Sequence, residues 1–542
     1  MGLGSIDLVV VAIYAIALFA IALWVSREPA GHQKDTEDYF LAGKSLPWWA
    51  IGASLIAANI SAEQIIGQSG QGFVVGLAIA AYEWQAAIVL LVVAKFFLPV
   101  FLKRGIYTMP QFLETRFGDE VKSVMAVFWL VLYTSVNLTA ILWLGGLAIS
   151  TVTGLGVLPA MAGLAAFSVL YSLYGGLKAV ALTDIIQVVI LILGGFAITW
   201  IALGLVGGQA GAIAGLHTLM GEIPGHFKMI LANDHPKYGD LPGIWTLLGG
   251  LWVLHFSYWG FNQYIIQRAL GAESLAEAQK GLAFAAFLKL LIPIIVVIPG
   301  VAALWLAQNG QLDMAMLDPG TCSVVDGKEV CGKPDSTYGL LMTLVPDGLR
   351  GLVFAALIAA IVSSLASMMN SISTIFTMDI YRDYIAKNRS ESHYVLVGRI
   401  TALSAMLIAL VLAKPFLGGM ESAFQTIQEY TGFVAPGVVA VFVLGFFWSR
   451  TNREGAFALL LSSIGLSIAA KVMLPELPFV LRIWIVFLVC LVVGVIVSAL
   501  TPKPAEDQPV DLGGIEFHTR RGFNIAAILI VLILAAIYVG FW

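Results

Sequence analysis

Charged residues are scarce in this sequence. Of its 542 residues, 11% are charged and 59% are hydrophobic, whereas a soluble domain carries about 25% charged and 45–50% apolar residues. So little charge excludes a water-facing globular surface and indicates that lipid is the solvent of most of the chain. The net charge of −4 offers no positive field to a nucleic-acid partner, so no nucleic acid is expected to bind.

Cysteine is also rare, with three residues in the chain. Cys490 lies inside an apolar run, which is typical of inert packing. Cys322 and Cys331 lie nine positions apart in a polar loop, and they can pair only if that loop faces an oxidising compartment.

Paired metal ligands, a nucleophile elbow and a phosphate-binding loop are all missing from the sequence, which argues against an enzyme.

Long apolar runs are abundant instead. A spanning helix needs about 20 mostly apolar residues, and open strands cannot cross lipid because their backbone groups would lack partners. The first run has no basic residue before it, so we expect a retained helix rather than a cleaved signal peptide. The sequence predicts an all-α membrane protein with about 14 spans: 5–25, 46–68, 76–102, 123–151, 155–174, 179–206, 243–267, 275–308, 347–381, 394–414, 421–448, 454–474, 479–500 and 522–542.

The distribution of Lys and Arg predicts the orientation. If the N-terminus is outside, the inner connections and helix ends hold twenty of the 29 basic residues and the outer ones hold eight. This choice predicts a multi-pass protein of the inner (plasma) membrane with both termini extracytoplasmic. It also places Cys322 and Cys331 outside, where a disulfide would persist. The long outer connections 207–242 and 309–346 are expected to form a vestibule or lid.

Polar residues interrupt two of the predicted spans. Asn59, Ser61, Glu63 and Gln64 divide the second span, and the run from His255 to Gln263 divides the seventh. Paired breaks at corresponding positions in two halves indicate a transporter built from an inverted repeat, because broken helices expose carbonyls and dipole ends to ions and solutes. The alternative for the second span is a face of small packing residues with one hydrogen-bonded Asn59.

Other polar side chains lie within predicted spans, where they are costly and usually face a cavity or a partner. They are Glu83, Asp184, Lys289, Ser363, Ser364, Gln425, Gln428 and Glu429. Glu83 and Lys289 could form a structural ion pair without contacting a solute.

Three runs in order along the chain resemble the sodium/solute symporter family, in particular its bacterial sodium/galactose and animal sodium/glucose cotransporters. These runs are Asp38–Lys44, Gly175–Val180 ahead of Asp184, and Ser363–Ser367 leading to Thr377–Tyr381. The resemblance implies a LeuT-like 5+5 inverted repeat with flanking helices. The first flanking helix is then 1–30, the repeats are 46–206 and 243–448, and the C-terminal flanking helices are 454–542.

The resemblance also implies a Na⁺ site between the second and ninth spans. Its ligands would be the carbonyls of Ala57, Ile60 and Ala360 and the hydroxyls of Ser363 and Ser364, with Asp184 nearby. A hard cation such as Na⁺ prefers oxygen ligands of this kind. Ala366 stands where some members place a hydroxyl for a second ion, so we expect one Na⁺ per cycle.

By the same resemblance, a sugar would contact Asn59, Gln64, Glu83, His255, Tyr258, Lys289 and Gln428. Tyr82, Trp259, Phe424 and Gln68 would form the gates. Ala86 and His255 depart from the galactose pattern, where Ser and Asn are expected, so the sequence does not assign the sugar. His255 reads as a neutral hydrogen-bonded residue or, alternatively, as a proton carrier.

The predicted function is Na⁺-coupled import of a hexose-type sugar by alternating access. One alternative is the same fold carrying an amino acid, sialic acid or a vitamin. The others are a membrane-embedded enzyme, a sensor and a channel.

Overall fold

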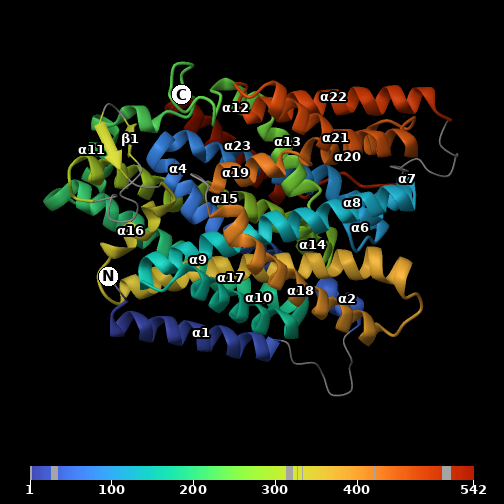
Figure 1. The fold of residues 1–542 in the computed structure, drawn as a ribbon, viewed down its shortest axis with the longest axis horizontal. Helices are drawn as coiled ribbons and strands as arrows, with labels where there is room; N and C mark the ends of the chain where they lie inside the picture. The colour runs from blue at the N-terminus through green and yellow to red at the C-terminus, as the bar shows by residue number, and fades with distance from the viewer. Residues whose placement is uncertain are drawn as a thin grey trace.

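The computed structural model of the chain describes residues 3–25, 35–312, 322–325, 328–331, 334–418, 423–502 and 514–542. The helices run mostly along one direction and form a single bundle (Figure 1). The helices of the N-terminal half are α1 (Ser5–Val25), α2 (Thr36–Leu41), α3 (Trp48–Asn59), α4 (Gln68–Val75), α5 (Ala81–Val92), α6 (Leu98–Arg104), α7 (Met109–Phe117), α8 (Asp119–Leu132), α9 (Thr139–Thr153), α10 (Val157–Gly207) and α11 (Gly211–Glu222).

The C-terminal half is also mostly helical. Its helices are α12 (Ile244–Leu248), α13 (Leu251–His255), α14 (Gln263–Leu270), α15 (Leu275–Gln308), α16 (Thr337–Thr343), α17 (Leu349–Ile375), α18 (Glu391–Leu417), α19 (Ala423–Thr431), α20 (Ala435–Phe447), α21 (Arg453–Met473), α22 (Phe479–Leu500) and α23 (Arg521–Gly540). Five wider π-helical segments occur between described helices, namely Glu63–Gly67, Val93–Phe97, Tyr133–Leu138, Phe256–Gly260 and Phe376–Ile385.

Nine helices in the described part of the chain are long and apolar enough to cross a membrane. The bent pair Phe424–Thr431 and Ala435–Phe447, which meets at 41°, makes a tenth. This is fewer than the fourteen spans predicted, because the second and seventh spans are divided into short helices. The first and fifth predicted spans are represented by the apolar stretches Ser5–Leu18 of α1 and Val157–Leu170 of α10, the parts of these helices that could be tested. The chain is therefore a helical membrane protein.

Both predicted breaks are present. Helix α3 ends at Asn59, and Ile60 has φ −80° and ψ 87°, which is outside the helical region. In the seventh span, α13 passes into a π-helical turn that ends at Gly260, and α14 starts only at Gln263. The side chain of Asn262 caps α14 by accepting a hydrogen bond from the Tyr264 N–H at 2.9 Å. The polar residues that interrupt the apolar pattern thus lie at or beside breaks and π-helical turns, as expected for broken spans.

The two long connections, 207–242 and 309–346, contain structure of their own. The first holds α11, and the second holds α16 and a hairpin of β1 (Cys322–Val325) and β2 (Lys328–Cys331). This short hairpin is an addition to the helical fold, and it lies in a connection, where a β-ladder is possible outside the lipid. Its antiparallel register makes Cys322 and Cys331 Cα partners, and partners in an antiparallel ladder lie about 4.5–5.5 Å apart, within the range of disulfides. Their side chains lie outside the described residues, so the disulfide stays a prediction.

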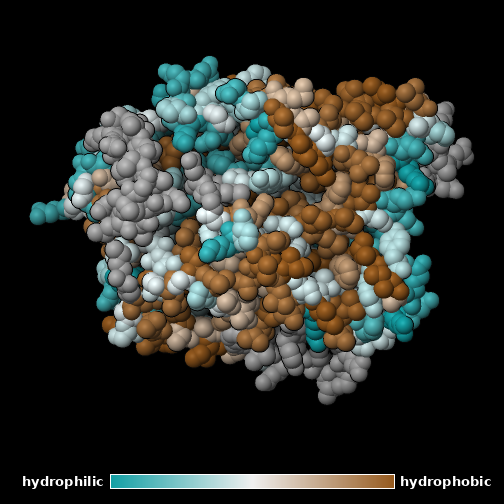
Figure 2. Space-filling model, viewed as in Figure 1, coloured by the Kyte–Doolittle hydropathy of each residue, from teal (hydrophilic) through white to brown (hydrophobic). Residues whose placement is uncertain are grey.

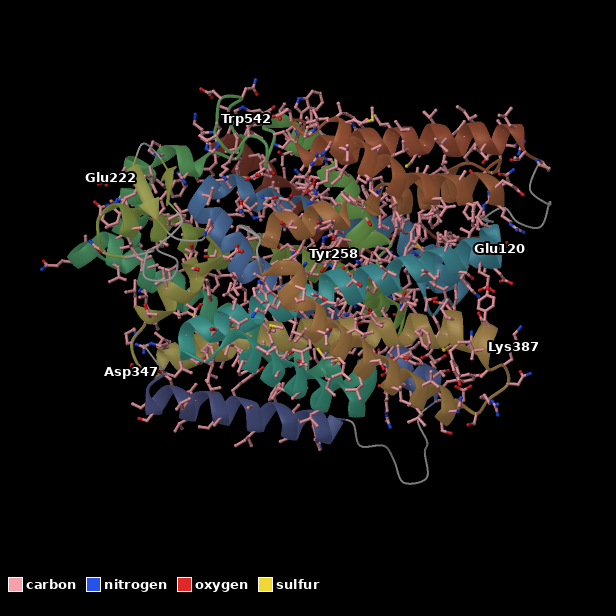
Figure 3. All side chains as sticks on the ribbon, viewed as in Figure 1. Glu120, Glu222, Tyr258, Asp347, Lys387 and Trp542 are labelled. Atoms are coloured by element: carbon pink, nitrogen blue, oxygen red, sulfur yellow. The ribbon has the colours of Figure 1, made fainter. Side chains whose placement is uncertain are left out.

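The ends of the chain lie toward one side of the bundle. Trp542, Glu222 and Asp347 are on the left in Figure 3, whereas Glu120 and Lys387 are on the right. The N-terminus is also on the left (Figure 1). Both termini therefore share a side of the bundle with the two long connections.

The molecular surface matches a lipid environment. Broad hydrophobic areas cover the middle of the molecule and hydrophilic residues gather toward its ends (Figure 2). Large apolar side chains stand exposed on the outer helices, for example Trp200 at 63% and Val411 at 73%. Polar side chains such as Glu83, Lys289 and Asp184 are instead buried, so these charges are kept away from the lipid-facing surface.

Helix α1 is attached to the core through Asp7, whose side chain is fully buried. Its Oδ1 accepts hydrogen bonds from the N–H groups of Gly348 (2.6 Å) and Gly351 (2.8 Å). Helix α17 has no cap from its own preceding side chain, so Asp7 supplies the N-terminal cap from another helix. A Cβ at Gly351 would lie 2.7 Å from the Asp7 Cα, which shows how closely α1 approaches.

Replacing Asp7 with alanine is expected to destabilise the protein by about 1–2 kcal/mol, the usual cost of a lost N-cap. The midpoint of thermal unfolding in detergent should fall. Glu454→Ala is the matched control, because Glu454 is an exposed acidic residue in the first turn of α21. Equal midpoints for the two variants would contradict the capping role.

Candidate functional site

A cavity lies where the two broken spans meet. Its volume is about 630 Å³ including the opening, within the usual range of small-molecule sites. The walls come from the break after α3 and from α5, α13, α15 and α19. Ten of the eleven predicted sugar and gate residues line it: Asn59, Gln64, Gln68, Tyr82, Glu83, His255, Tyr258, Trp259, Lys289 and Gln428. Tyr258 lies near the centre of the bundle (Figure 3).

A buried ion pair is the centre of this cavity. The Lys289 ammonium donates to the Glu83 carboxylate and to the Asn59 side-chain carbonyl. The side chains of Lys289 and Glu83 are 1% and 2% exposed. The Gln68 amide donates to the other Glu83 oxygen at 2.6 Å, and the Asn59 amide donates to the Tyr258 hydroxyl at 3.2 Å. Each member of the pair is thus hydrogen-bonded as well as charge-matched, as buried charges require.

Aromatic rings bound the cavity on two sides. Tyr258 and Trp259 make an edge contact with centroids 5.1 Å apart, and the Lys289 ammonium lies 4.7 Å from the Trp259 ring centroid. On the other side, Tyr82 packs edge-on against Phe424 at 5.4 Å and lies 6.4 Å from the His255 ring. Phe424, the eleventh predicted residue, is not part of the lining itself but packs against Tyr82, which is.

Asp240, in the connection 207–242, is partly buried. Burial raises the pKa of the Asp240 carboxyl, against the charges of Lys237 and His235. No residue of the connection 207–242 is in the lining of the cavity, so its role as a vestibule or lid stays a prediction.

His255 contributes an unusual polar group. Its ring bonds to the backbone of Ala81, while its Nε2 is buried and has no hydrogen-bond partner among the described residues. Unpartnered buried nitrogen atoms are uncommon in native structures. Ala86, the second departure from the galactose pattern, is completely buried.

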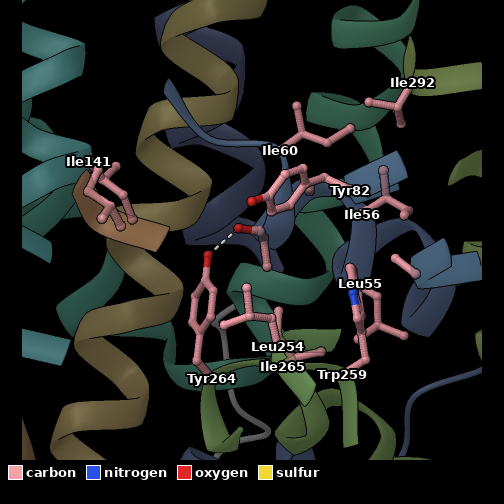
Figure 4. Close-up of a cluster of buried hydrophobic side chains, with 14 of the residues drawn as sticks. Leu55, Ile56, Ile60, Tyr82, Ile141, Leu254, Trp259, Tyr264, Ile265 and Ile292 are labelled. Carbon is pink, nitrogen blue, oxygen red and sulfur yellow. Dashed lines mark hydrogen bonds between the residues drawn. The ribbon is translucent and has the colours of Figure 1, made fainter. Parts of the chain in front are cut away.

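The predicted Na⁺ ligands lie at the break of α3 beside α17. Ala57, Ile60, Ala360, Ser363 and Ser364 are all at most 1% exposed, and α17 packs against α3. The Ser364 hydroxyl donates to the Ala58 carbonyl at 2.8 Å. The Tyr264 hydroxyl donates to the same carbonyl, as the dashed line in Figure 4 marks. Oxygen atoms are therefore concentrated here in the form that suits a hard cation.

Asp184 lies directly behind the serine pair. Its carboxylate accepts from the hydroxyls of Ser363 and Ser54, each at 2.5 Å. Arg268 lies 3.7 Å from the same carboxylate and also donates to the Ser54 hydroxyl at 2.7 Å. All of these groups are buried. The carboxylate of Asp184 is therefore paired with the Arg268 guanidinium and in contact with the Ser363 hydroxyl.

The structure adds cavity residues that the sequence analysis had not selected, namely Glu63, Asn137, Leu254, Asn262 and Thr431. In the sequence, Glu63 is distinguished only as one of the polar residues that divide the second span. Its carboxylate accepts from the Gln428 amide at 3.1 Å. Asn137 belongs to the π-helical segment Tyr133–Leu138, and its polar neighbours in the fourth span were a signal that could have identified it.

The three polar residues predicted in the eleventh span separate in the structure. Gln428 lines the cavity. Glu429 points to Lys471 (2.9 Å) and Arg482 (2.6 Å) and so belongs to a structural ion cluster. Gln425 donates to the Gln71 side chain at 3.3 Å.

Comparisons with known proteins agree on one family. The profile of the Sodium:solute symporter family matches residues 39–463. A sodium/glucose cotransporter of Vibrio parahaemolyticus is 50% identical over 543 residues, covering 100% of this chain and 99% of the relative. Sodium/glucose cotransporter 1 of Ovis aries is 33% identical, covering 88% and 73%.

A solved structure shows the same fold. It is described as a substrate-bound outward-open state of a Na⁺-coupled sialic acid symporter, and it covers 93% of this chain and 99% of its own chain with a TM-score of 0.79. At 22% identity, this likeness concerns the fold alone. With a profile that matches most of the chain and a relative of 50% identity along its full length, the chain belongs to the sodium:solute symporter family.

Proposed function

We propose that this protein couples the inward movement of Na⁺ to the uptake of a neutral hexose-type sugar. It is a transporter and not an enzyme, and Na⁺ is a transported substrate rather than a resident cofactor. The observation that carries the proposal is the buried Lys289–Glu83 pair with its amide neighbours, held in a cavity between two broken helices. The names of the relatives, sodium/glucose cotransporters, support the same class of solute.

The cavity suits a polyhydroxylated ring. A sugar hydroxyl both donates and accepts hydrogen bonds, so it needs acceptors, donors and amides in alternation. Glu83, Lys289 and Gln428 provide these three kinds of group, and Gln64 and His255 add further polar atoms. The Tyr258 and Trp259 rings supply an apolar face for the C–H groups of the ring. The Nε2 of His255, which has no hydrogen-bond partner in the described part of the chain, would acquire a hydroxyl partner in the bound state.

The charge balance disfavours an anionic solute such as sialic acid. The cavity contains two carboxylates, Glu63 and Glu83, and one ammonium, Lys289. Lys289 is already engaged by Glu83 and Asn59. A carboxylate solute would therefore enter without a free cation to bind it, and burying an unpaired charge is costly. An amino acid or a vitamin remains the alternative class for the same fold.

For Na⁺, we propose the ligand set Ala57, Ile60, Ala360, Ser363 and Ser364, with Asp184 as the nearby charge. Its support is the concentration of buried oxygens around the break of α3. When the ion binds, a lone pair of the Ser364 hydroxyl oxygen would face Na⁺, while its O–H can still donate to the Ala58 carbonyl. Asp184 retains Ser363 and provides a negative field that is weakened by Arg268. We propose one Na⁺ per cycle, because Ala366 has no hydroxyl at the position where some family members bind a second ion.

The proposed architecture has fourteen spans. Repeats 46–206 and 243–448 form a LeuT-like 5+5 core, flanked by 1–30 and 454–542. The protein lies in the plasma membrane with both termini extracytoplasmic. Closing of Tyr82 on Phe424 and opening at Tyr258 would alternate access to the cavity. One charge moved through 100 mV contributes about 2.3 kcal/mol, and a tenfold Na⁺ gradient adds about 1.4 kcal/mol, enough for roughly a few-hundred-fold accumulation.

The test is uptake by purified protein in liposomes with an imposed Na⁺ gradient and an inside-negative potential. Labelled glucose and galactose are compared with labelled sialic acid and neutral amino acids. Na⁺-dependent accumulation of a hexose is expected. Hexose uptake that is independent of external Na⁺ would contradict the proposal. So would Na⁺-dependent uptake of sialic acid or amino acids without uptake of a hexose.

Glu63 should contribute to the rejection of anionic sugars. In the wild-type protein, a hexuronate is expected to inhibit hexose uptake at least about tenfold more weakly than a neutral hexose, because like charges in a desolvated site repel. Glu63→Gln should narrow this ratio. Glu429→Gln is the control, since Glu429 is in the ion cluster with Lys471 and Arg482. An unchanged ratio in Glu63→Gln would exclude Glu63 from selectivity.

A further inference from the structure

A second cavity lies at the surface between α15, the start of α3 and the C-terminal helix α23. It measures about 910 Å³ including its open side. Positions three to four apart put the apolar lining of each helix on one face. The facing apolar side chains are Ala283, Phe284 and Phe287 on α15 and Phe523, Ala526 and Ile530 on α23. Lys280 is the one charged side chain among the described residues of the lining.

The dimensions of this groove match a lipid tail. From Phe523 to Ile533, α23 rises about 15 Å, half the ~30 Å thickness of the hydrocarbon core. The groove therefore extends through one leaflet. Phe287 and Ile533 are 47% and 43% exposed, so its open side faces the bilayer. A polar solute would leave these side chains unmatched, whereas an acyl chain would bury them.

Positive charge collects at one end of the groove. Lys280 lines it, and the adjacent Arg520 and Arg521 are exposed at the start of α23. A nearby carboxylate, Glu277, accepts from Lys280 at 2.7 Å and from the Trp48 N–H at 3.0 Å. Helix α23 is 20 residues long and its first turn has no side-chain cap, so its N–H groups also favour an anion.

We propose that this groove binds one anionic phospholipid, with an acyl chain along α23 and its phosphate among Lys280, Arg520 and Arg521. The amphiphilic shape of the groove and the charge complementarity at its end both select this class of molecule. Helix α15 also carries Lys289, nine residues beyond Lys280, and α23 packs against α15 and α5, which carries Glu83. The bound lipid would thus pack against the lipid-facing surface of the helices that hold the central ion pair.

The test uses the full chain in nanodiscs of phosphatidylcholine with a minor fraction of phosphatidylglycerol. After extraction into mild detergent, native mass spectrometry measures the retained lipid. Arg520→Gln/Arg521→Gln should retain phosphatidylglycerol about 30-fold more weakly, because each basic residue near an anionic lipid contributes a factor of about five. Ala526→Trp should also lose it, since the ring fills the groove while the arginines stay in place.

The control is Lys387→Gln/Arg389→Gln, which removes two exposed charges at the end of the bundle where Lys387 lies (Figure 3). Wild-type retention in the control and loss in both groove variants would support the site. Equal losses in control and groove variants would indicate only general surface attraction and overturn the proposal. Equal retention of phosphatidylcholine and phosphatidylglycerol by the wild-type protein would do the same. Lipid retention is measured without transport, so it does not depend on the proposed solute.

Discussion

Replacing Lys289 with methionine is expected to reduce Na⁺-driven sugar uptake at least about 100-fold. Removal of one partner of a buried ion pair costs about 3–5 kcal/mol, and here it leaves the buried Glu83 side chain without its cation, with the Gln68 amide as its remaining side-chain donor among the described residues. The sugar also loses its one cationic donor. Initial rates of uptake in liposomes, corrected for the amount of folded protein, measure the effect.

The double variant Glu83→Gln/Lys289→Met separates stability from solute binding. With both charges removed, no uncompensated charge stays buried, and the yield of folded protein should recover relative to Lys289→Met. Uptake should not recover, because the groups that bind the hydroxyls are changed. Recovery of transport together with yield would show that the pair is a structural ion pair, the alternative that the sequence had left open.

Replacing Ser364 with alanine is expected to raise the Na⁺ concentration needed for half-maximal uptake by about tenfold or more. One lost oxygen ligand of about 1.5–3 kcal/mol, the usual range for a hydrogen bond to a charged group, corresponds to a change of about 10- to 150-fold. Uptake at saturating Na⁺ should largely persist, since the sugar groups are unchanged. Sugar uptake as a function of external Na⁺ measures the shift.

Ser373→Ala is a closely matched control for this experiment. Ser373 lies on α17, nine residues beyond Ser364, and is similarly buried. Its hydroxyl has no hydrogen-bond partner among the described residues, so its loss should leave the Na⁺ dependence unchanged. A Ser364→Ala curve that overlays both the wild type and Ser373→Ala would remove Ser364 from the ligand set.

The breaks and the candidate pocket could be foreseen to different degrees. Composition and polar interruptions are local properties, so they predicted a helical membrane protein and located the breaks at Asn59 and after His255. The pocket residues came from the family resemblance, and the structure brings ten of them around one cavity. Their ligand roles remain predictions, because contact with one cavity does not identify a solute.

Other features depended on contacts that a one-dimensional pattern does not contain. Gln428 and Glu429 are neighbours in sequence, yet one lines the cavity and the other joins Lys471 and Arg482, because adjacent helical positions point about 100° apart. Likewise, nothing in the first span showed that Asp7 would cap α17.

The sequence by itself determined that most of this protein lies in lipid, that it is helical and where its spans are broken. The reason is that each polar residue in a span carries its own free-energy cost, which can be assessed locally. Only the tertiary structure decided which buried charges neutralise each other. It pairs Lys289 with Glu83 and Arg268 with Asp184, partners far apart in the chain. Such pairing depends on distances of a few ångströms between helices, and those distances are set by the packing of the whole bundle.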